Sequence, residues 1–416
     1  MKISWNDKYD PELIAQKIEE TKKVDKNGKI SFAGFEFLEY ETLLFSMLRF
    51  PIEIPDREAQ NIVKSAIRVS AKNGKITPKS MLAQASKLAN SYLALPFTRY
   101  TLYTSISINS RWQSPISKVH FGNNIICFDK EPSKKFIKAS SQILQQTEKS
   151  TIGGMPKDYT YVRVFVSARE IYEAADQAID TIDFVRAVWN WQINMKTGLR
   201  YSTGSNPKRI NKLILGPIHT LHYPNGQIAS SATWWYEPNY VGPIETYRDK
   251  DEWKQLSEFL KKVKFRLSKH KYADIIENSL IRYTRALDER NLQSSFLRLW
   301  SVLELLTNTE KESYDVTIKR TAFLFEDTNY HRQVLLQLRD YRNATVHLDK
   351  EDKEIETHLY QLKGYVEAQL GFHLFNNFGF KTIQDAAIFL NSSTLKKDIN
   401  HQIKMLSNVK HYRRYS

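Results

Sequence analysis

The sequence predicts an α+β region over residues 1–251, followed by an all-α helical bundle over residues 252–416. Two observations predict this division. Period-two alternation of apolar residues and a hairpin turn signal are confined to the first region, whereas from Glu252 onward apolar residues recur almost everywhere at helical spacing. The 416 residues are 41% hydrophobic, which is enough for two or three packed domains.

In the first region, segments with the helical spacing of apolar residues alternate with segments that have the period-two spacing of strands. Thr77 and Pro78 mark a helix start, as cap and first helical residue. Pro224-Asn225-Gly226 between two apolar runs predicts a hairpin. The elements expected here are helix 11–23, strand 30–37, helices 57–73 and 78–95, strands 98–108 and 117–128, a helix capped by Ser133, strand 161–166, helix 169–194, and strands 213–222 and 227–236.

A glycine pair lies in the clearest loop of this region, residues 151–156, and predicts a break between two subdomains near 151–157. No Gly-Lys-Ser/Thr follows the pair, so a nucleotide-binding loop of that type is excluded. Trp234 and Trp235 could stack on bases, but strand alternation predicts that one of them is buried and the other exposed. His219 and His222 are three residues apart on a predicted strand, and that spacing argues against a shared metal.

The second region keeps helical spacing throughout. Asp349 is the predicted cap of the helix that carries Ile355, Leu359, Leu362, Val366 and Leu370. The expected helices are 253–269, 272–289, 294–306, 316–326, 329–346, the helix after Asp349, and one or two short helices after Gly379. A basic and aromatic tail begins at Lys404.

The net charge of +15 predicts a polyanionic partner, with nucleic acid first and an acidic membrane surface second. The single cysteine, Cys127, rules out a disulfide within the chain and a cysteine zinc site. Together with the lack of a membrane-length apolar run and of a signal peptide, it predicts a protein of the cytoplasm that does not enter a membrane.

The motif Arg342-Asn343-Ala344-Thr345-Val346-His347 ends one of the predicted helices. Of the ten histidines, only His347 has an arginine five to seven positions before it. A guanidinium offers a planar fork of donors to a phosphate, and an imidazole can transfer a proton near neutral pH. These groups could together cleave a phosphodiester without a metal or another cofactor.

The order of helix, polar loop, helix, motif and closing helix over about residues 270–375 resembles the HEPN superfamily. The run from Phe296 to Leu306 looks like the helix that precedes the motif in the ApeA-like branch, which is linked to bacterial defence against phage. The resemblance implies a metal-independent endoribonuclease with Arg342, Asn343 and His347 as catalytic residues, acting on RNA such as tRNA. It also implies a homodimer with a composite active site, an abortive-infection role with toxicity when the enzyme is freely active, and a front region that senses a phage-derived or cellular trigger.

Geometry limits how this motif can act. Residues five apart on one helix are separated by about 140° around its axis, so Arg342 and His347 would not converge on one phosphate. Either the helix ends near Thr345-Val346, or the two residues work across a dimer. Arg339 and Lys350 flank the motif as candidate phosphate contacts, and Glu304 is a candidate partner of Arg342 or His347.

Simpler interpretations stay open for every one of these residues. Arg342 could pair with Asp340 or Asp349 as a surface ion, His347 could cap a helix, and the others could be solvated. At the level of function, the alternatives to an endoribonuclease are a non-catalytic RNA-binding protein and a dimerising interaction module. Loss of cleavage with retained RNA binding in His347→Ala would favour the enzyme.

Overall fold

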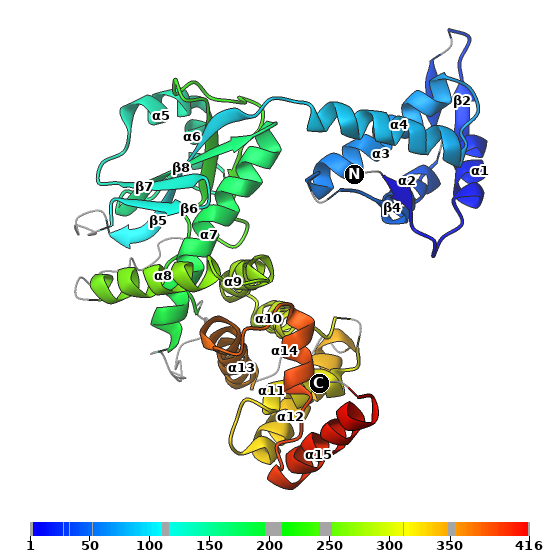
Figure 1. Cartoon of the computed structure of the whole chain (residues 1–416). Coiled ribbons are helices and arrows are strands. Elements are labelled where there is room, and N and C mark those ends of the chain that lie inside the picture. Colours follow the sequence, from blue (N-terminus) through cyan, green and yellow to red (C-terminus); the bar gives the residue numbers. More distant parts are fainter. Residues whose placement is uncertain are drawn as a thin grey trace. The chain divides into compact units, whose positions relative to one another are not determined.

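The computed structural model describes residues 3–27, 29–32, 34–51, 53–109, 116–150, 152–195, 210–240, 252–310, 312–347 and 354–414, without the side chains of 345–347. Contacts divide the chain into two compact units (Figure 1). Unit 1 comprises Met1–Thr98 with Ser167–Glu173, and unit 2 comprises Arg99–Val166 with Ala174–Ser416. The loop at 152–157, where a subdomain break is predicted, lies inside unit 2. The predicted boundary between 251 and 252 adjoins residues outside the described part and stays a prediction.

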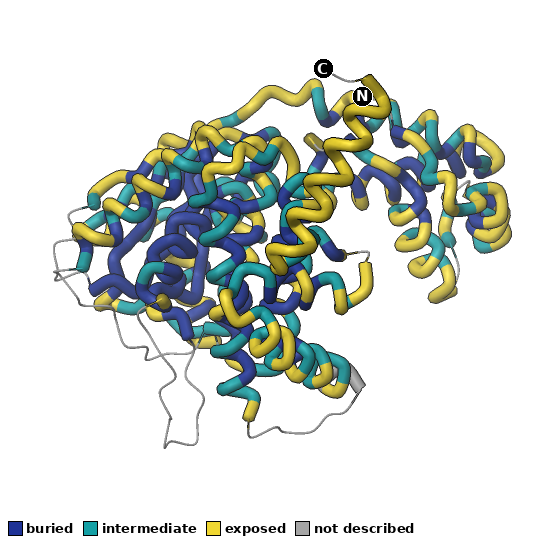
Figure 2. The backbone as a smooth tube through the Cα atoms, turned by 60° about the horizontal axis from the view of Figure 1, so that its bottom comes forward, coloured by how far each residue is buried: buried dark blue, intermediate teal, exposed yellow. Residues whose placement is uncertain are grey.

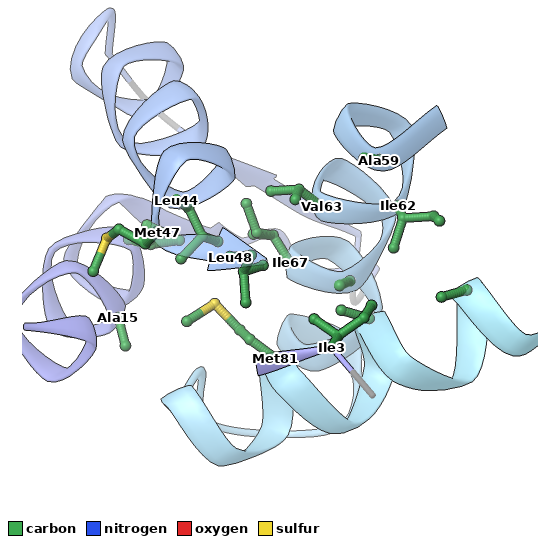
Figure 3. Packing of buried hydrophobic residues seen from close by; sticks show 14 of the residues in the cluster. Ile3, Ala15, Leu44, Met47, Leu48, Ala59, Ile62, Val63, Ile67 and Met81 are labelled. Atoms are coloured by element: carbon green, nitrogen blue, oxygen red, sulfur yellow. The ribbon is translucent and has the colours of Figure 1, made fainter. Parts of the chain in front are cut away.

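Unit 1 is a small helical unit with two short antiparallel ribbons, β1 with β4 and β2 with β3. Its elements are β1 Ser4–Trp5, α1 Pro11–Thr21, β2 Lys22–Val24, β3 Ile30–Phe32, α2 Glu36–Met47, β4 Leu48–Arg49, α3 Asp56–Lys72 and α4 Pro78–Leu93. Helix α4 begins as predicted, because the Thr77 side chain accepts a hydrogen bond from the Ser80 amide in a capping box. Leu44, Ile67 and Met81 meet in the core of this unit (Figure 3).

The predicted strand 30–37 is only partly correct. Its first three residues form β3, but Gly34 has φ of +95° and the chain then enters α2, which the sequence analysis missed. The alternation of aromatic residues that suggested a longer strand has another cause. Phe32 and Phe37 stack on each other with ring centroids 4.3 Å apart across this bend.

Unit 2 contains a six-stranded sheet with the order β10-β9-β5-β8-β7-β6. The strands are β5 Thr98–Asn109, β6 Lys118–Phe121, β7 Asn124–Asp129, β8 Tyr159–Ala168, β9 Ile218–His222 and β10 Trp235–Tyr236. The pairs β5–β9, β6–β7, β7–β8 and β9–β10 are antiparallel, with Tyr103 opposite Thr220 and Trp235 opposite His219. The strands predicted at 98–108 and 161–166 are confirmed, and the predicted run 117–128, which contains Gly122-Asn123-Asn124, forms the two paired strands β6 and β7.

The predicted hairpin is confirmed at its turn but not along its length. Gly226 has φ of +88° and the Tyr223 amide donates to the Gln227 carbonyl. Of the predicted strand 227–236, however, only β10 and an isolated bridge at Ile228 pair with β9. Trp234 and Trp235 are therefore both half-buried, and the expected contrast between a buried and an exposed tryptophan is wrong.

Helices cover both faces of this sheet. The helices are α5 Lys134–Ala139, α6 Ser141–Glu148 and α7 Ile171–Met195. On one face, Phe136 of α5 packs on Tyr103 and Tyr161. Ser133 occupies the capping position of α5, as predicted, but its side chain makes no capping hydrogen bond. On the other face, Phe121 and Phe128 pack on α7, in which every residue from 181 to 191 is buried. A helix buried on all sides must pair any charge that it carries.

The rest of unit 2 is helical, as predicted (Figure 1). The helices are α8 Trp253–Leu267, α9 Ala273–Leu287, α10 Leu292–Thr307, α11 Tyr314–Ala322, α12 Thr328–His347, α13 Ile355–Phe375, α14 Ile383–Leu390 and α15 Lys396–Tyr412. The predicted stripe of α13 is buried at Leu359, Leu362, Val366 and Leu370. The predicted cap Asp349 lies outside the described residues, and Glu354 occupies the capping position. None of the helices in the described part is long and apolar enough to cross a membrane.

A buried histidine joins three of these helices. The His373 ring of α13 lies 2.8 Å from the Leu306 carbonyl at the end of α10, and 2.9 Å from the Tyr272 hydroxyl before α9. The ring donates from Nε2 to the carbonyl and accepts at Nδ1 from the hydroxyl, which requires the neutral form. Burial accordingly lowers the pKa of His373 to about 4.

We expect this histidine to make unit 2 less stable in acid. Because the pKa of His373 is lowered on folding from an ordinary value near 6.5 to about 4, the unfolded chain binds more protons between these values. The free energy of unfolding should therefore fall as pH drops from about 6.5 towards 4. Urea denaturation at pH 7 and pH 5 measures this. His373→Gln, which retains a donor and an acceptor, should show a shallower dependence on pH; an unchanged dependence would remove His373 as its source.

Candidate functional site

Helix α12 carries Arg342 at a position that faces the interior of the bundle. Leu335 and Leu338 are fully buried, and Arg342 continues their stripe at helical spacing i, i+3, i+7. A third apolar residue at position 342 would complete an ordinary core-facing stripe. The guanidinium instead stands half-buried at the end of that stripe, beside the first turn of α11.

The Arg342 guanidinium lies over the ring of Tyr314, 4.8 Å from its centroid. With the adjacent Asn343, it makes a weak contact of 3.5 Å to the side-chain oxygen. Among the residues that the structure describes, Arg342 forms no ion pair with a carboxylate. Within the described part of the chain, an aromatic face positions the donors of Arg342 and no carboxylate is paired with them.

Glu304 of α10 lies near this arginine. Burial raises the pKa of the Glu304 carboxyl, while the hydrogen bond from Trp300 and the charge of Arg342 act in the opposite direction. Trp300 Nε1 donates to Glu304 at 2.9 Å and so fixes the carboxyl group. The structure thus brings Glu304 and Arg342 together electrostatically, without a direct ion pair between them.

Arg339, one turn before Arg342, has a different environment. Its guanidinium pairs with Asp315 at the start of α11 and with the adjacent Asp340, each at 2.9 Å. These two carboxylates neutralise the cation, so the structure favours the surface ion-pair interpretation of Arg339 over a role in binding phosphate.

Of the remaining predicted residues, the structure describes only the backbone of His347, and Lys350 lies outside the described residues. Helix α12 continues through Thr345 and Val346 to His347, so the helix does not end at the β-branched pair. By helical geometry, position 347 then lies about 140° from Arg342 and about 40° from Asn343. Both arrangements considered from the sequence, a helix end near this pair and cooperation between two chains, stay predictions, because the side chain of His347 lies outside the described residues.

Sequence analysis missed a second group of charged residues, buried between α7 and α9. Arg186 is completely buried and pairs with Asp183 and Asp288, each at 2.7 Å. Arg285 binds the second oxygen of Asp183 and pairs with Glu237 at 2.6 Å. The available signal was an arginine three residues after Asp183 in the mostly apolar helix α7, but Asp288, its other partner, lies about a hundred positions away in the chain.

The two histidines of β9 lie in separate hydrogen-bond networks. His219 is 2.6 Å from the Thr104 hydroxyl and 2.9 Å from Glu237, whose pKa burial would raise but the contacts with His219 and Arg285 hold low. His222 is 3.2 Å from the Ser140 hydroxyl, and burial lowers its pKa to about 4. Over the described ranges, the structure contains no group of three His, Cys, Asp or Glu side chains that could hold a metal ion.

The chain matches no protein-family model, no curated protein and no solved structure. The HEPN resemblance consequently rests on the motif and on the order of the helices alone.

Proposed function

We propose that this protein is a metal-independent endoribonuclease of the HEPN type that uses Arg342, Asn343 and His347. The observation that supports this most directly is the environment of Arg342. A half-buried guanidinium faces the bundle interior, lies over Tyr314, and has no carboxylate partner among the described residues. Ordinary structural arginines in such positions are paired, as Arg186 and Arg320 are in this same unit.

The chemistry requires few groups. A base takes the proton from a 2′-hydroxyl, the 2′-oxygen attacks the adjacent phosphorus, and an acid protonates the leaving 5′-oxygen. The bond from phosphorus to the 5′-oxygen breaks, and the products are a 2′,3′-cyclic phosphate and a 5′-hydroxyl. His347 is the proposed proton-transfer group, Arg342 the stabiliser of charge on the phosphate, and Asn343 a polar support. DNA lacks the 2′-hydroxyl and should not be cleaved.

The proposed active site is formed by two chains. Since α12 is continuous to His347, one chain presents positions 342 and 347 on different sides of the helix. A homodimer that places two α12 helices side by side would supply two arginines and two histidines, enough for an acid and a base. In this proposal residues 1–251 sense a phage-derived or cellular trigger and restrain the bundle, which fits an abortive-infection role in antiviral defence.

A cleavage assay with EDTA present tests this function. Total tRNA and a mixed single-stranded RNA are incubated with the wild type and with His347→Ala, and the product ends are analysed. We expect cleavage by the wild type alone, ending in cyclic phosphates, with RNA binding retained by the variant. Equal cleavage by both proteins would rule out His347 as the proton-transfer group. Binding by both without cleavage, even in extracts of phage-infected cells, would favour a non-catalytic RNA-binding protein.

A further inference from the structure

Helix α15 near the end of the chain has an apolar face that nothing in the described structure covers. None of its seventeen residues is buried, and Figure 2 shows it as a continuously exposed helix near the C-terminus. Three large apolar side chains of this helix, Ile403, Leu406 and Val409, are more than half exposed. Such a face is costly in water and requires an occupant.

Most of the aliphatic residues of α15 lie on one side of the helix axis, with Gln402 among them. Leu395, Ile399, Ile403 and Leu406 recur at spacings of four, four and three, which places them within about 80° of one another. Val409 extends the same face. The opposite side carries Lys397, Asn400, His401, Lys404, Asn408 and His411.

The charged residues of this segment are almost all basic. Residues 395–414 contain six lysines and arginines and a single acidic residue, Asp398. The net charge of these twenty residues is therefore +5, a third of the +15 of the whole chain. Lys396 borders the apolar face and Lys410 lies within it near the end of the helix, where long side chains can bury their stems and keep their charges in a polar layer.

From these observations we propose that α15 binds the surface of a membrane rich in anionic lipids. A basic amphipathic helix lies in the plane of the interface, with its apolar face among the acyl chains and its cations among the anionic headgroups. A membrane surface therefore accounts for both the apolar face and the basic residues of the helix. An RNA partner would leave the apolar face unexplained, and pairing with α15 of a second copy would bring two clusters of +5 together.

The proposal is independent of the ribonuclease site. It concerns contact with a surface only and requires no membrane-spanning helix. Among the polyanionic partners that the net charge allows, it assigns the acidic membrane surface to this one segment.

Vesicle co-sedimentation of the full chain tests the proposal. The probes are vesicles of phosphatidylcholine alone and of equal parts phosphatidylcholine and phosphatidylglycerol. We expect the wild type to sediment with the anionic vesicles at least about tenfold more than with the neutral ones. Ile403→Gln with Leu406→Gln should lower binding to the anionic vesicles by about tenfold or more, because the burial of two apolar side chains is lost. Lys397→Gln with Lys404→Gln should lower it by a similar factor.

The control variant is Leu13→Gln with Leu38→Gln, which replaces two exposed leucines of unit 1 and should sediment like the wild type. Since α15 has no buried residue, its variants should fold normally, which circular dichroism verifies. Equal sedimentation of the wild type and Ile403→Gln/Leu406→Gln would overturn the proposal. Failure of the wild type to bind either kind of vesicle would also overturn the proposal. Loss of RNA binding in the lysine variant would then assign α15 to RNA. Conversion of a dimer to a monomer in the apolar variant would assign it to a second copy of the chain.

Discussion

Replacing Arg342 by alanine is expected to lower the rate of RNA cleavage by about a hundredfold to a thousandfold, the usual effect of removing one group that stabilises charge in a transition state. The structure gives a specific reason for so large an effect. The Arg342 guanidinium is held over Tyr314 and pairs with no carboxylate of the described residues, an arrangement that would suit the binding of a phosphate. The half-buried setting also strengthens its interaction with an anion relative to open water.

Arg339→Ala is the matched control for this prediction. Arg339 lies one turn away on the same helix, but it is paired with Asp315 and Asp340. We expect Arg339→Ala to retain cleavage within about a few-fold of the wild type, since exposed ion pairs contribute little. Single-turnover cleavage rates with EDTA present compare the three proteins. If both arginine variants lost activity equally, a general loss of positive charge would explain the result better than a specific role for Arg342.

Replacing Arg186 by alanine is expected to lower the free energy of unfolding of unit 2 by about 3–5 kcal/mol, the range for a broken buried ion pair. Arg186 is completely buried between Asp183 and Asp288, so its loss leaves two carboxylates in the interior with fewer partners. Burial already raises the pKa of Asp288 against the opposing charges of Arg186 and Arg285. Urea denaturation followed by tryptophan fluorescence measures the change, since Trp189 and Trp191 are buried on the same helix.

A comparison at two pH values separates the loss of charge from the loss of packing. Without Arg186, the pKa of Asp288 should rise further in the folded state, so protonation at lower pH favours folding of the variant. The difference in stability between wild type and variant should therefore be smaller at pH 5 than at pH 7. Arg163→Ala, which breaks a partly exposed pair with Asp129, should cost about 1 kcal/mol or less. A pH-independent loss in Arg186→Ala would point to a packing defect instead.

Local patterns predicted most of the helices and the central strands, because burial on one face imposes a period that the sequence must follow. The stripe of α13 and the capping box of α4 are examples. The prediction failed where aromatic residues pack on one another, as Phe32 and Phe37 do, since side-chain stacking can imitate the alternation of a strand. It also failed over 229–234, where the hairpin turn is present but few pairs follow it.

The candidate site was predictable only in part for a related reason. The motif itself is local, so Arg342 and Asn343 could be found from spacing. Their surroundings are not local: Tyr314 and Glu304 approach Arg342 only because α10, α11 and α12 pack together. Asp288, one of the two buried partners of Arg186, is equally remote in sequence, and neither period nor composition identifies it.

Two buried polar contacts that link α7 to the helical bundle also affect how parts of this protein could be exchanged between genes by recombination. Asp288, which directly follows α9, is paired with Arg186 of α7, and Lys363 of α13 donates to the backbone carbonyl of Asn194 at 3.0 Å. A recombination breakpoint near residue 252 would deliver the bundle to a new host protein without α7. The transplanted helices would then carry a buried carboxylate and a buried ammonium that have lost partners. We therefore expect viable exchanges to transfer α7 and the bundle together, as one inherited piece.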